Sequence, residues 1–361
     1  MKLRSEVLKG MLAKAIKGAG GNKLIPVTSL LKIEVRNGVV TLETTDATNY
    51  LYVMGKVDSD GELYAVVDAD LFAKLVSKTT SEFIDIFVND TAPLLHVKGN
   101  GSYTIEMPLD GDGMLVQYPD PVDGVAWEEL TTINKHTVDD VLFSVKPSLA
   151  TTYENPCYTG YYAGDTVIAT DNYKIARMDY NLFNGVDVLI SSDAMDLLGI
   201  FTSEKIRVSR DVDTEDRFLF ESEDVMLYSP ELIDKEDFAL EEIEQLLDVD
   251  FPNMCEVSKS QFISVLDRLA LFISPYDRNA VKMTFSADGL QISSVAESGV
   301  EVIGYTDDAE ERTQFLCEVD VEILLAEVKA VRSDVFTVQY GLDNALKFVD
   351  GDLTIVVALL E

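Results

Sequence analysis

Apolar and polar residues alternate along three stretches of the chain, as they do in strands that bury one face. The stretches have similar layouts and cover Leu31–Val53, Tyr158–Tyr180 and Val281–Tyr305. In the first, Asn37-Gly38 is a typical two-residue hairpin turn. When Asp46, Asp171 and Ala296 are taken as equivalent positions, successive stretches lie 125 residues apart. Two equal intervals predict an internal threefold repeat.

Each repeat also contains two segments in which apolar residues recur at helical spacing. The leading segments are Ser5–Lys17, Thr137–Val145 and Lys259–Ile273, and the middle segments are Ala69–Ser77, Asp193–Phe201 and Val321–Val331. Three short strands are predicted after each middle helix, at Ile84–Val88, Leu94–Val97 and Ser102–Met107; Lys205–Ser209, Phe218–Phe220 and Val225–Tyr228; and Val335–Tyr340, Leu346–Val349 and Leu353–Ala358. This order predicts an α+β fold with helices on one face and antiparallel sheets on the other.

Two breaks suggest where the repeats meet. The first is the Pro- and Gly-rich segment 119–124, and the second is the acidic connection 241–253. We therefore predict three similar domains, covering residues 1–124, 125–250 and 251–361.

The charge of the chain is unevenly distributed. Its 361 residues include 29 Lys and Arg against 64 Asp and Glu, a net charge of -35, which excludes a generally basic nucleic-acid coat. The first 23 residues nevertheless carry a net +5, so the remainder carries -40. Helical spacing places Lys9, Lys14 and Lys17 on one face, and two further basic pairs share faces on later helices. These faces are either ordinary solvated surface or sites of weak, sequence-independent phosphate contact.

The chain has few of the residues that catalysis commonly uses. It contains two His and no CxxC, HExxH, GxSxG or P-loop motif, and its hydrophobic content of 47% indicates a folded protein. An enzyme of unrecognised type is therefore the least favoured reading. Three scattered Cys, the absence of a signal-peptide pattern and a longest apolar run of Thr354–Leu360 predict a cytoplasmic protein without a membrane span.

Two acidic clusters leave a further alternative open. Asp110 and Asp112, and the run from Asp211 to Asp216, resemble calcium loops but lack the full EF-hand spacing, so hairpin turns are favoured. The alternative is an acidic calcium-binding or adhesion-type β-repeat protein. We expect no metal and no cofactor.

The threefold repeat, the segment from Ala169 to Ala176 (ATDNYKIA) and the last strand, Leu353–Leu360, together resemble a known family. The chain is similar to the bacterial DNA polymerase III beta subunit, the DNA sliding clamp, in a divergent form such as a bacteriophage or plasmid would encode. The resemblance covers essentially the whole chain. It implies three domains of the clamp fold in each protomer and a ring-shaped, head-to-tail homodimer.

The resemblance also implies the function. A ring of this kind catalyses no reaction; it encircles double-stranded DNA and tethers the replicative polymerase for processive synthesis. The polymerase and the clamp loader would bind through a short apolar peptide.

The resemblance further implies three sets of site residues. DNA would be contacted by Lys9, Lys14, Lys17, Lys23, Lys74, Lys78, Tyr153, Lys259, Arg268, Lys329 and Arg332. The partner peptide would bind Tyr158, Thr170, Asn172, Tyr173, Lys174, Ile175, Leu240, Ile243, Leu342, Ala345, Ile355, Val357, Ala358, Leu359 and Leu360. The dimer interface would join Tyr103, Ile105 and Met107 to Leu271, Phe272 and Ile273, unless these residues are simply buried within one domain.

The chain departs from the family pattern at two places in the proposed peptide pocket. Asn172-Tyr173-Lys174 replaces Gly-His-Arg, so we expect Asn172 to adopt the positive φ that the tight turn needs. The usual end, Met-Pro-Met-Arg-Leu, is Val-Ala-Leu-Leu-Glu here. The preference of the pocket among partners is therefore expected to differ.

Overall fold

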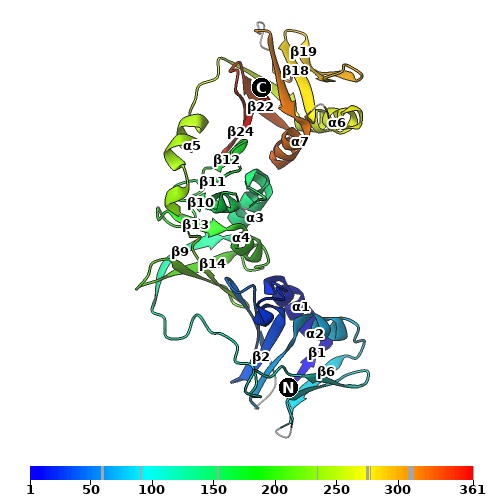
Figure 1. Ribbon diagram of the computed structural model, residues 1–361, viewed down its shortest axis with the longest axis vertical. Helices are drawn as coiled ribbons and strands as arrows, with labels where there is room; N and C mark the ends of the chain where they lie inside the picture. The colour runs from blue at the N-terminus through cyan, green and yellow to red at the C-terminus, as the bar shows by residue number, and fades with distance from the viewer. Residues whose placement is uncertain are drawn as a thin grey trace. The chain divides into compact units, whose positions relative to one another are not determined.

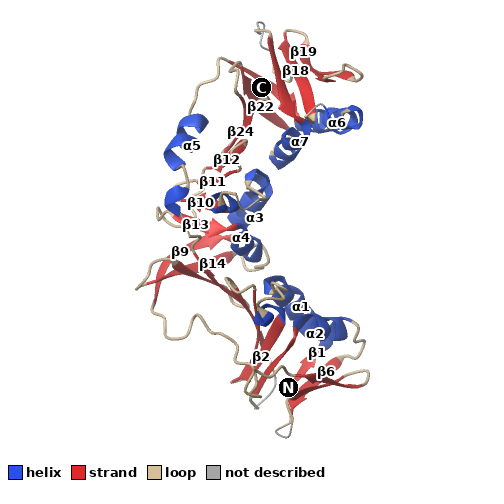
Figure 2. Ribbon diagram, viewed as in Figure 1, coloured by secondary structure: helices blue, strands red, loops and turns tan. Residues whose placement is uncertain are grey.

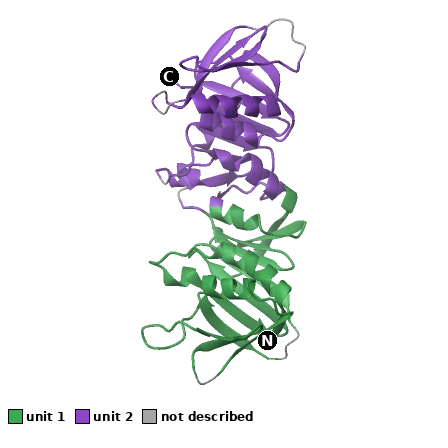
Figure 3. Ribbon diagram, turned by 90° about the vertical axis from the view of Figure 1, so that its right-hand side faces the viewer, with its two compact units in different colours: residues 1–136, 193–231 green, residues 137–192, 232–361 purple. Residues whose placement is uncertain are grey.

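The computed structural model describes residues 1–360 except 58–60, 90–91, 153, 234, 274–275, 277 and 308–312. The described chain forms two compact units (Figure 3). Unit 1 contains residues 1–136 and 193–231, and unit 2 contains residues 137–192 and 232–361.

One order of elements occurs three times along the chain: a strand, a helix, three strands, then again a strand, a helix and three strands (Figure 1). The first repeat consists of β1 (Lys2–Arg4), α1 (Ser5–Ala15), β2 (Leu30–Arg36), β3 (Val39–Thr45), β4 (Tyr50–Lys56), β5 (Leu63–Asp68), α2 (Ala69–Ser77), β6 (Phe83–Val88), β7 (Leu94–Lys98) and β8 (Ser102–Glu106). The second consists of β9 (Trp127–Asn134), α3 (Lys135–Ser144), β10 (Gly160–Ala163), β11 (Val167–Thr170), β12 (Lys174–Met178), β13 (Val188–Ser191), α4 (Ser192–Leu198), β14 (Lys205–Asp211), β15 (Arg217–Glu221) and β16 (Val225–Pro230).

After the helix α5 (Leu240–Leu247), the third repeat has the same order. It consists of β17 (Asn253–Ser258), α6 (Lys259–Leu269), β18 (Ala280–Ser286), β19 (Gly289–Ser294), β20 (Val300–Ile303), β21 (Phe315–Asp320), α7 (Val321–Ala330), β22 (Val335–Tyr340), β23 (Ala345–Asp350) and β24 (Leu353–Ala358). Short 3-10 turns extend three of the helices or their loops, at η1 (Ile16–Gly18), η3 (Lys146–Ser148) and η6 (Ala270–Phe272).

Local chemistry explains where the helices begin and which face they bury. The Asp68 carboxylate accepts the Leu71 N–H at 2.7 Å and starts α2, and Asp320 accepts the N–H groups of Glu322 and Ile323 at the start of α7. In α1, the buried residues Leu8, Met11, Leu12 and Ala15 follow helical spacing. Within unit 1, α1 and α2 lie side by side against one face of the sheets (Figure 2).

All the sheets are antiparallel, and two of them join consecutive repeats. The sheet of unit 1 has the order β5-β2-β3-β4-β16-β15-β14-β9, so β4 of the first repeat pairs with β16 of the second. The sheet of unit 2 has the order β13-β10-β11-β12-β24-β23-β22-β17, so β12 of the second repeat pairs with β24 of the third. Because of this pairing, unit 1 combines the first repeat with half of the second, and unit 2 combines the other half of the second repeat with the third.

The α+β class and the antiparallel sheets confirm the sequence prediction. The predicted strands Val335–Tyr340 and Leu353–Ala358 are β22 and β24 with the same bounds. The sequence reading missed the strands that precede the leading helices, β1, β9 and β17, and it treated the segment that forms α5 as an acidic connection. The signal for α5 was present, because its buried residues Ile243 and Leu247 and the half-buried Leu240 have helical spacing. The boundaries of the three domains remain predictions.

Candidate functional site

The cations predicted to face DNA fall into three groups in the structure. Lys17, Lys23 and Lys78 are exposed, and no ion pair is found for them among the described residues. Tyr153 lies outside the described residues. The remaining cations each contact a group of the chain itself.

Four of these cations are neutralised at the surface by a nearby carboxylate. Lys9 pairs with Glu6 at 3.1 Å, Lys74 with Asp70, and Lys329 with Asp267 at 3.7 Å. Arg268 binds both carboxylate oxygens of Glu301, at 2.7 and 2.5 Å. These pairs offset the positive charge of the four side chains.

The other three predicted cations hold parts of the fold together. Lys14 of α1 donates to Asp224 at 2.6 Å and to Thr202 at 3.0 Å, and so ties the first repeat to the second within unit 1. Lys259 donates to the Val331 carbonyl at 2.5 Å.

Arg332 has the same structural part in unit 2. It lies between Asp140 of α3, at 3.1 Å, and Asp352 at the tip of the β23–β24 hairpin. Its guanidinium is therefore engaged in joining the second repeat to the third.

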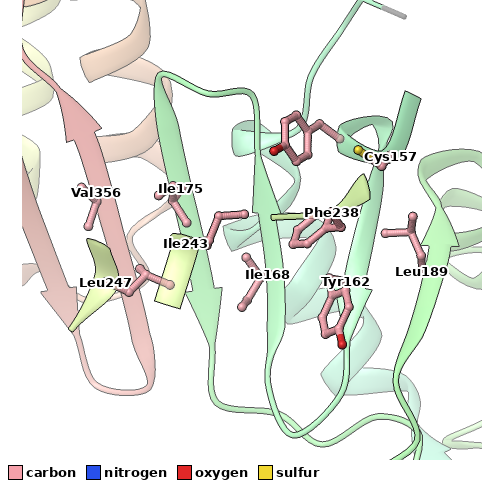
Figure 4. Packing of buried hydrophobic residues seen from close by; sticks show 10 residues of the cluster. Cys157, Tyr162, Ile168, Ile175, Leu189, Phe238, Ile243, Leu247 and Val356 are labelled. Carbon is pink, nitrogen blue, oxygen red and sulfur yellow. The ribbon is translucent and has the colours of Figure 1, made fainter. Parts of the chain in front are cut away.

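The proposed partner pocket lies on the face of the sheet of unit 2 that α5 covers, where α5 packs against β12 and β24. One apolar cluster brings together five of its predicted residues: Tyr158, Ile175, Leu240, Ile243 and Ala345. Figure 4 shows Ile175 and Ile243 among the buried members of this cluster. The same cluster contains residues that the sequence reading did not select, namely Cys157, Tyr162, Ile168, Leu189, Phe238, Leu247 and Val356. The helix α5 thus covers this cluster and contributes Ile243 and Leu247 to it.

Two predicted pocket residues of β24, Ile355 and Val357, lie on the face of the strand that points away from the apolar cluster. Val356 belongs to the cluster, whereas its neighbours Ile355 and Val357 are fully buried and outside it. Successive side chains of a strand point to opposite faces, which explains the difference. Ile355 and Val357 support the strand from behind.

The β11–β12 turn forms one rim of the cluster. Asn172 has φ +75°, which confirms the expectation that it adopts a positive φ in this turn. Asp171 accepts the N–H groups of Tyr173 and Lys174 at 3.0 Å each, and Thr170 Oγ1 donates to the Lys174 carbonyl at 2.8 Å. Tyr173 is 66% exposed.

The last residues of the chain lie against this turn. The Ala358 N–H donates to the Tyr173 carbonyl at 2.8 Å, and Leu359 and Leu360 donate to the carbonyls of Asn344 and Glu318. Ala358, Leu359, Leu360 and Leu342 are all half-buried. The turn and the C-terminal residues are thereby held in one arrangement.

A buried ion pair lies behind the turn. Lys174 Nζ lies 3.4 Å from Glu327 Oε1 on α7, and it also donates to the Pro147 carbonyl in η3. Ser148 Oγ donates to Glu327 Oε2 at 3.0 Å. Glu327 is fully buried, and this loss of solvent raises the pKa of its carboxyl to about 7 although Lys174 opposes the rise. The sequence analysis selected Lys174 for the pocket but did not identify Glu327 as its partner.

Two strands, β8 and β20, lie at the edges of their sheets, whereas the corresponding strands of the other repeats are interior strands. The strands β5, β13 and β21 are sheet edges in all three repeats, whereas β4 and β12, which precede β5 and β13 in the chain, are interior strands. Among the described residues, the corresponding β20 is an edge, and so is β8, which corresponds to β16 and β24. Consecutive repeats are joined by the pairings β4–β16 and β12–β24, and we call this type of pairing the joint. The edges β20 and β8 correspond to its two sides.

The predicted interface residues lie at these two edges. Tyr103 on β8 is 43% exposed, whereas Ile105 and Met107 are buried within unit 1. Leu271 and Phe272 in η6 are 81% and 55% exposed, and Ile273 is half-buried. A Cβ atom on Gly299, next to β20, would lie 3.4 Å from the Phe272 ring, which places η6 beside the β20 edge.

Comparison of this geometry with solved structures gives close matches over the whole chain. The beta chain of DNA polymerase III from Streptococcus pneumoniae TIGR4 is 16% identical, with a TM-score of 0.85 over 100% of this chain and 99% of that one. The beta subunit from Streptococcus pyogenes is also 16% identical, with a TM-score of 0.86 and the same coverage. The sliding clamp from Bacillus subtilis is 17% identical, with a TM-score of 0.82 over 100% and 98% of the two chains.

The chain has the sliding-clamp fold. No protein-family model matches its sequence, and no curated protein matches it either. The sliding-clamp fold therefore persists here at a level of sequence identity where comparison of sequences alone finds no relative.

Within the sliding-clamp fold, the acidic clusters that resembled calcium loops are hairpin turns. Asp110 Oδ1 accepts the N–H groups of Asp112 and Met114 at 2.9 Å each. Asp211 accepts the Asp213 N–H and the Thr214 hydroxyl, also at 2.9 Å. In the described part of the chain, no three His, Cys, Asp or Glu residues are grouped so that they could hold a metal ion.

Two further observations concern the chain as a whole. The three cysteines, Cys157, Cys255 and Cys317, are buried thiols. Among the described residues, none of the helices is both long enough and apolar enough to cross a bilayer.

Proposed function

We propose that this chain is the subunit of a DNA sliding clamp, in which two copies close head to tail into a ring around double-stranded DNA. The ring catalyses no reaction. It tethers the replicative polymerase to DNA in the cytoplasm, and it binds the polymerase and the clamp loader through short apolar peptides. The unmatched edges β8 and β20 are the observation that carries this proposal.

The pairing of strands between consecutive repeats is the basis for the proposed contact between two copies. In unit 1, β4 pairs antiparallel with β16, and in unit 2, β12 pairs with β24 in the same way. By the same rule, β20 of one copy would pair with β8 of another, and β8 of the first with β20 of the second. In a dimer of this kind, both β8 edges and both β20 edges are paired. The assembly is therefore closed, and neither edge is available to bind a third chain.

Side chains at the two edges support this pairing. Tyr103 on β8, Val300 and Val302 on β20, and Leu271 and Phe272 in η6 are exposed apolar residues. An exposed edge strand with apolar side chains favours association, because unpaired backbone groups and apolar surface are both available.

The cations on the helices fit a protein that slides. Strong binding to many phosphates raises affinity and hinders translocation, whereas a few weak contacts allow it. Lys17, Lys23 and Lys78 are exposed, and Lys9, Lys74, Arg268 and Lys329 are balanced by neighbouring carboxylates. We infer that DNA is retained mainly because it is enclosed. Lys14, Lys259 and Arg332 would contribute mainly by holding the helices in place.

The apolar cluster under α5 is the proposed binding region for partner peptides. Its half-buried margin contains Leu240 and Ala345, and the exposed Tyr173 lies beside the C-terminal residues. Apolar anchors of a partner would gain most of their binding energy by being desolvated in such a region.

Retention on circular DNA tests the proposal. The protein is diluted until it dissociates, concentrated again in the presence of nicked circular DNA, and separated from free protein by gel filtration. We expect it to remain with the circle and to be released when a restriction enzyme opens the circle. Equal retention on the linear DNA, or no retention on the circle, would contradict topological binding.

A further inference from the structure

The ion pair between Lys174 and Glu327 connects three parts of unit 2. Glu327 lies on α7, Lys174 begins β12 directly after the turn of Asn172 and Tyr173, and the Pro147 carbonyl lies in η3. The Lys174 side chain is 11% exposed and Glu327 is fully buried. The pair is therefore enclosed by the protein on all these sides.

The contacts of Lys174 set the position of the turn. Its ammonium group is held from behind by Glu327 at 3.4 Å, with Asp171 of the turn at 3.8 Å. Its own backbone carbonyl accepts the Thr170 hydroxyl, and the preceding carbonyl, of Tyr173, accepts the Ala358 N–H. A displacement of Lys174 would thus move both the exposed Tyr173 and the C-terminal residues.

Stability alone is a poor reason for such a pair. Removing two charges from water costs about as much as their attraction returns, and an apolar pair of similar volume is often at least as stable. Glu327 Oε1 also lacks a hydrogen-bond partner in the described structure. A buried pair of this kind is better explained by the geometry it enforces.

We propose that Glu327 is a positioning residue for the partner pocket: through Lys174 it fixes the β11–β12 turn and, with it, the C-terminal residues of the pocket. This inference rests on the proposed function of the pocket. Glu327 itself does not touch the partner; it acts only through the turn.

The chain contains a matched control for this pair. In unit 1, Lys32 lies 2.9 Å from Glu43, with side chains 11% and 1% exposed. Burial raises the pKa of Glu43 to about 7 as well. This second pair has the same chemistry and burial, but it belongs to the other compact unit and has no part in the pocket.

The test compares Glu327→Gln with Glu43→Gln. Gln keeps the size of Glu and still accepts hydrogen bonds, but it removes the charge that holds the lysine. Two measurements are made on the full-length protein: hydrogen exchange of the Ala358 amide, and affinity for a fluorescein-labelled synthetic hexapeptide with Leu and Phe anchors.

We expect Glu327→Gln to speed exchange of the Ala358 amide and to weaken binding of the hexapeptide, each by roughly three- to tenfold. Glu43→Gln should leave both values at those of the wild type. Unchanged exchange and affinity in Glu327→Gln would overturn the inference, and so would equal effects of the two substitutions.

The outcomes also separate this inference from the proposed function. If the wild type does not bind the hexapeptide, the exchange measurement still decides whether Glu327 positions the turn. If Glu327→Gln behaves as expected but the protein is not retained on circular DNA, the positioning role stands and the clamp function fails.

Discussion

At the scale of single residues, two buried glutamates have an unusual environment. Glu43 and Glu327 are each enclosed beside a lysine, and burial raises the pKa of each carboxyl from its ordinary value near 4.5 to about 7. The folded protein therefore binds protons that the unfolded chain releases at the same pH. These two groups make the protein less stable as the pH rises from about 4.5 through about 7.

This shift gives a prediction for stability. Between about pH 5.5 and about pH 8, each glutamate should lower the free energy of unfolding by on the order of 2 kcal/mol. In Glu43→Gln or Glu327→Gln, urea denaturation should show a smaller loss of stability over this range than in the wild type, because the substituted group no longer titrates. The difference between wild type and variant at each pH removes the contribution of the other carboxylates, which the two proteins share. The same pH dependence in wild type and variants would show that these groups titrate normally.

The turn residues show what could be predicted from the sequence at this scale. Asn172 was expected to take a positive φ because it replaces Gly, and its φ is +75°. Glu327 could not be selected in the same way. It lies among 64 acidic residues, and only the packing of α7 against the turn shows that it meets Lys174.

At the scale of elements, the period of the apolar pattern determined most of what the sequence predicted. Alternation located the strands after each middle helix, and helical spacing located α1, α2, α6 and α7. The face of a strand was harder to assign. Ile355 and Val357 were chosen for the pocket, but Val356 between them lies in the cluster, because all three are apolar and a strand buried on both faces carries no alternation.

The free edges give the prediction at this scale. Tyr103→Glu places a charge on β8 where β20 of a second copy would pair, and Tyr103 is 43% exposed, so the subunit should still fold. We expect sedimentation equilibrium to show two chains for the wild type and one for the variant, with a dissociation constant raised by about 100-fold or more, because the charge would be buried without a partner.

Met254→Glu is the matched control for this substitution. Met254 is 66% exposed on β17, an edge strand of the sheet in unit 2 that has no part in the proposed joint. This variant should keep the mass of two chains. A monomeric wild type, or dissociation by both substitutions, would count against pairing of β8 with β20.

At the scale of the whole molecule, electrostatics affects the two associations differently, because the net charge of -35 acts between copies and the local lysines act on DNA. Two copies with the same large charge repel each other, whereas contact between lysines and phosphates is attractive. Salt screens both effects, since the screening length falls from about 10 Å at 0.1 M to about 3 Å at 1 M.

We therefore expect the dimer to tighten as salt increases. Between about 0.1 M and about 1 M NaCl, the dissociation constant measured by sedimentation should fall by about tenfold, while any binding to short linear DNA weakens. A dimer that loosens over this range would mean that opposite charges attract each other across the joint.

The joint between repeats has a consequence for how such a protein can change over generations. In both β4–β16 and β12–β24 the repeats are connected by main-chain hydrogen bonds, which every residue except proline can make. Mutations can therefore replace most side chains at the joint without removing the bonds that connect its two sides. Such tolerance explains how chains that are only 16–17% identical to this one can have the same fold, with TM-scores of 0.82–0.86.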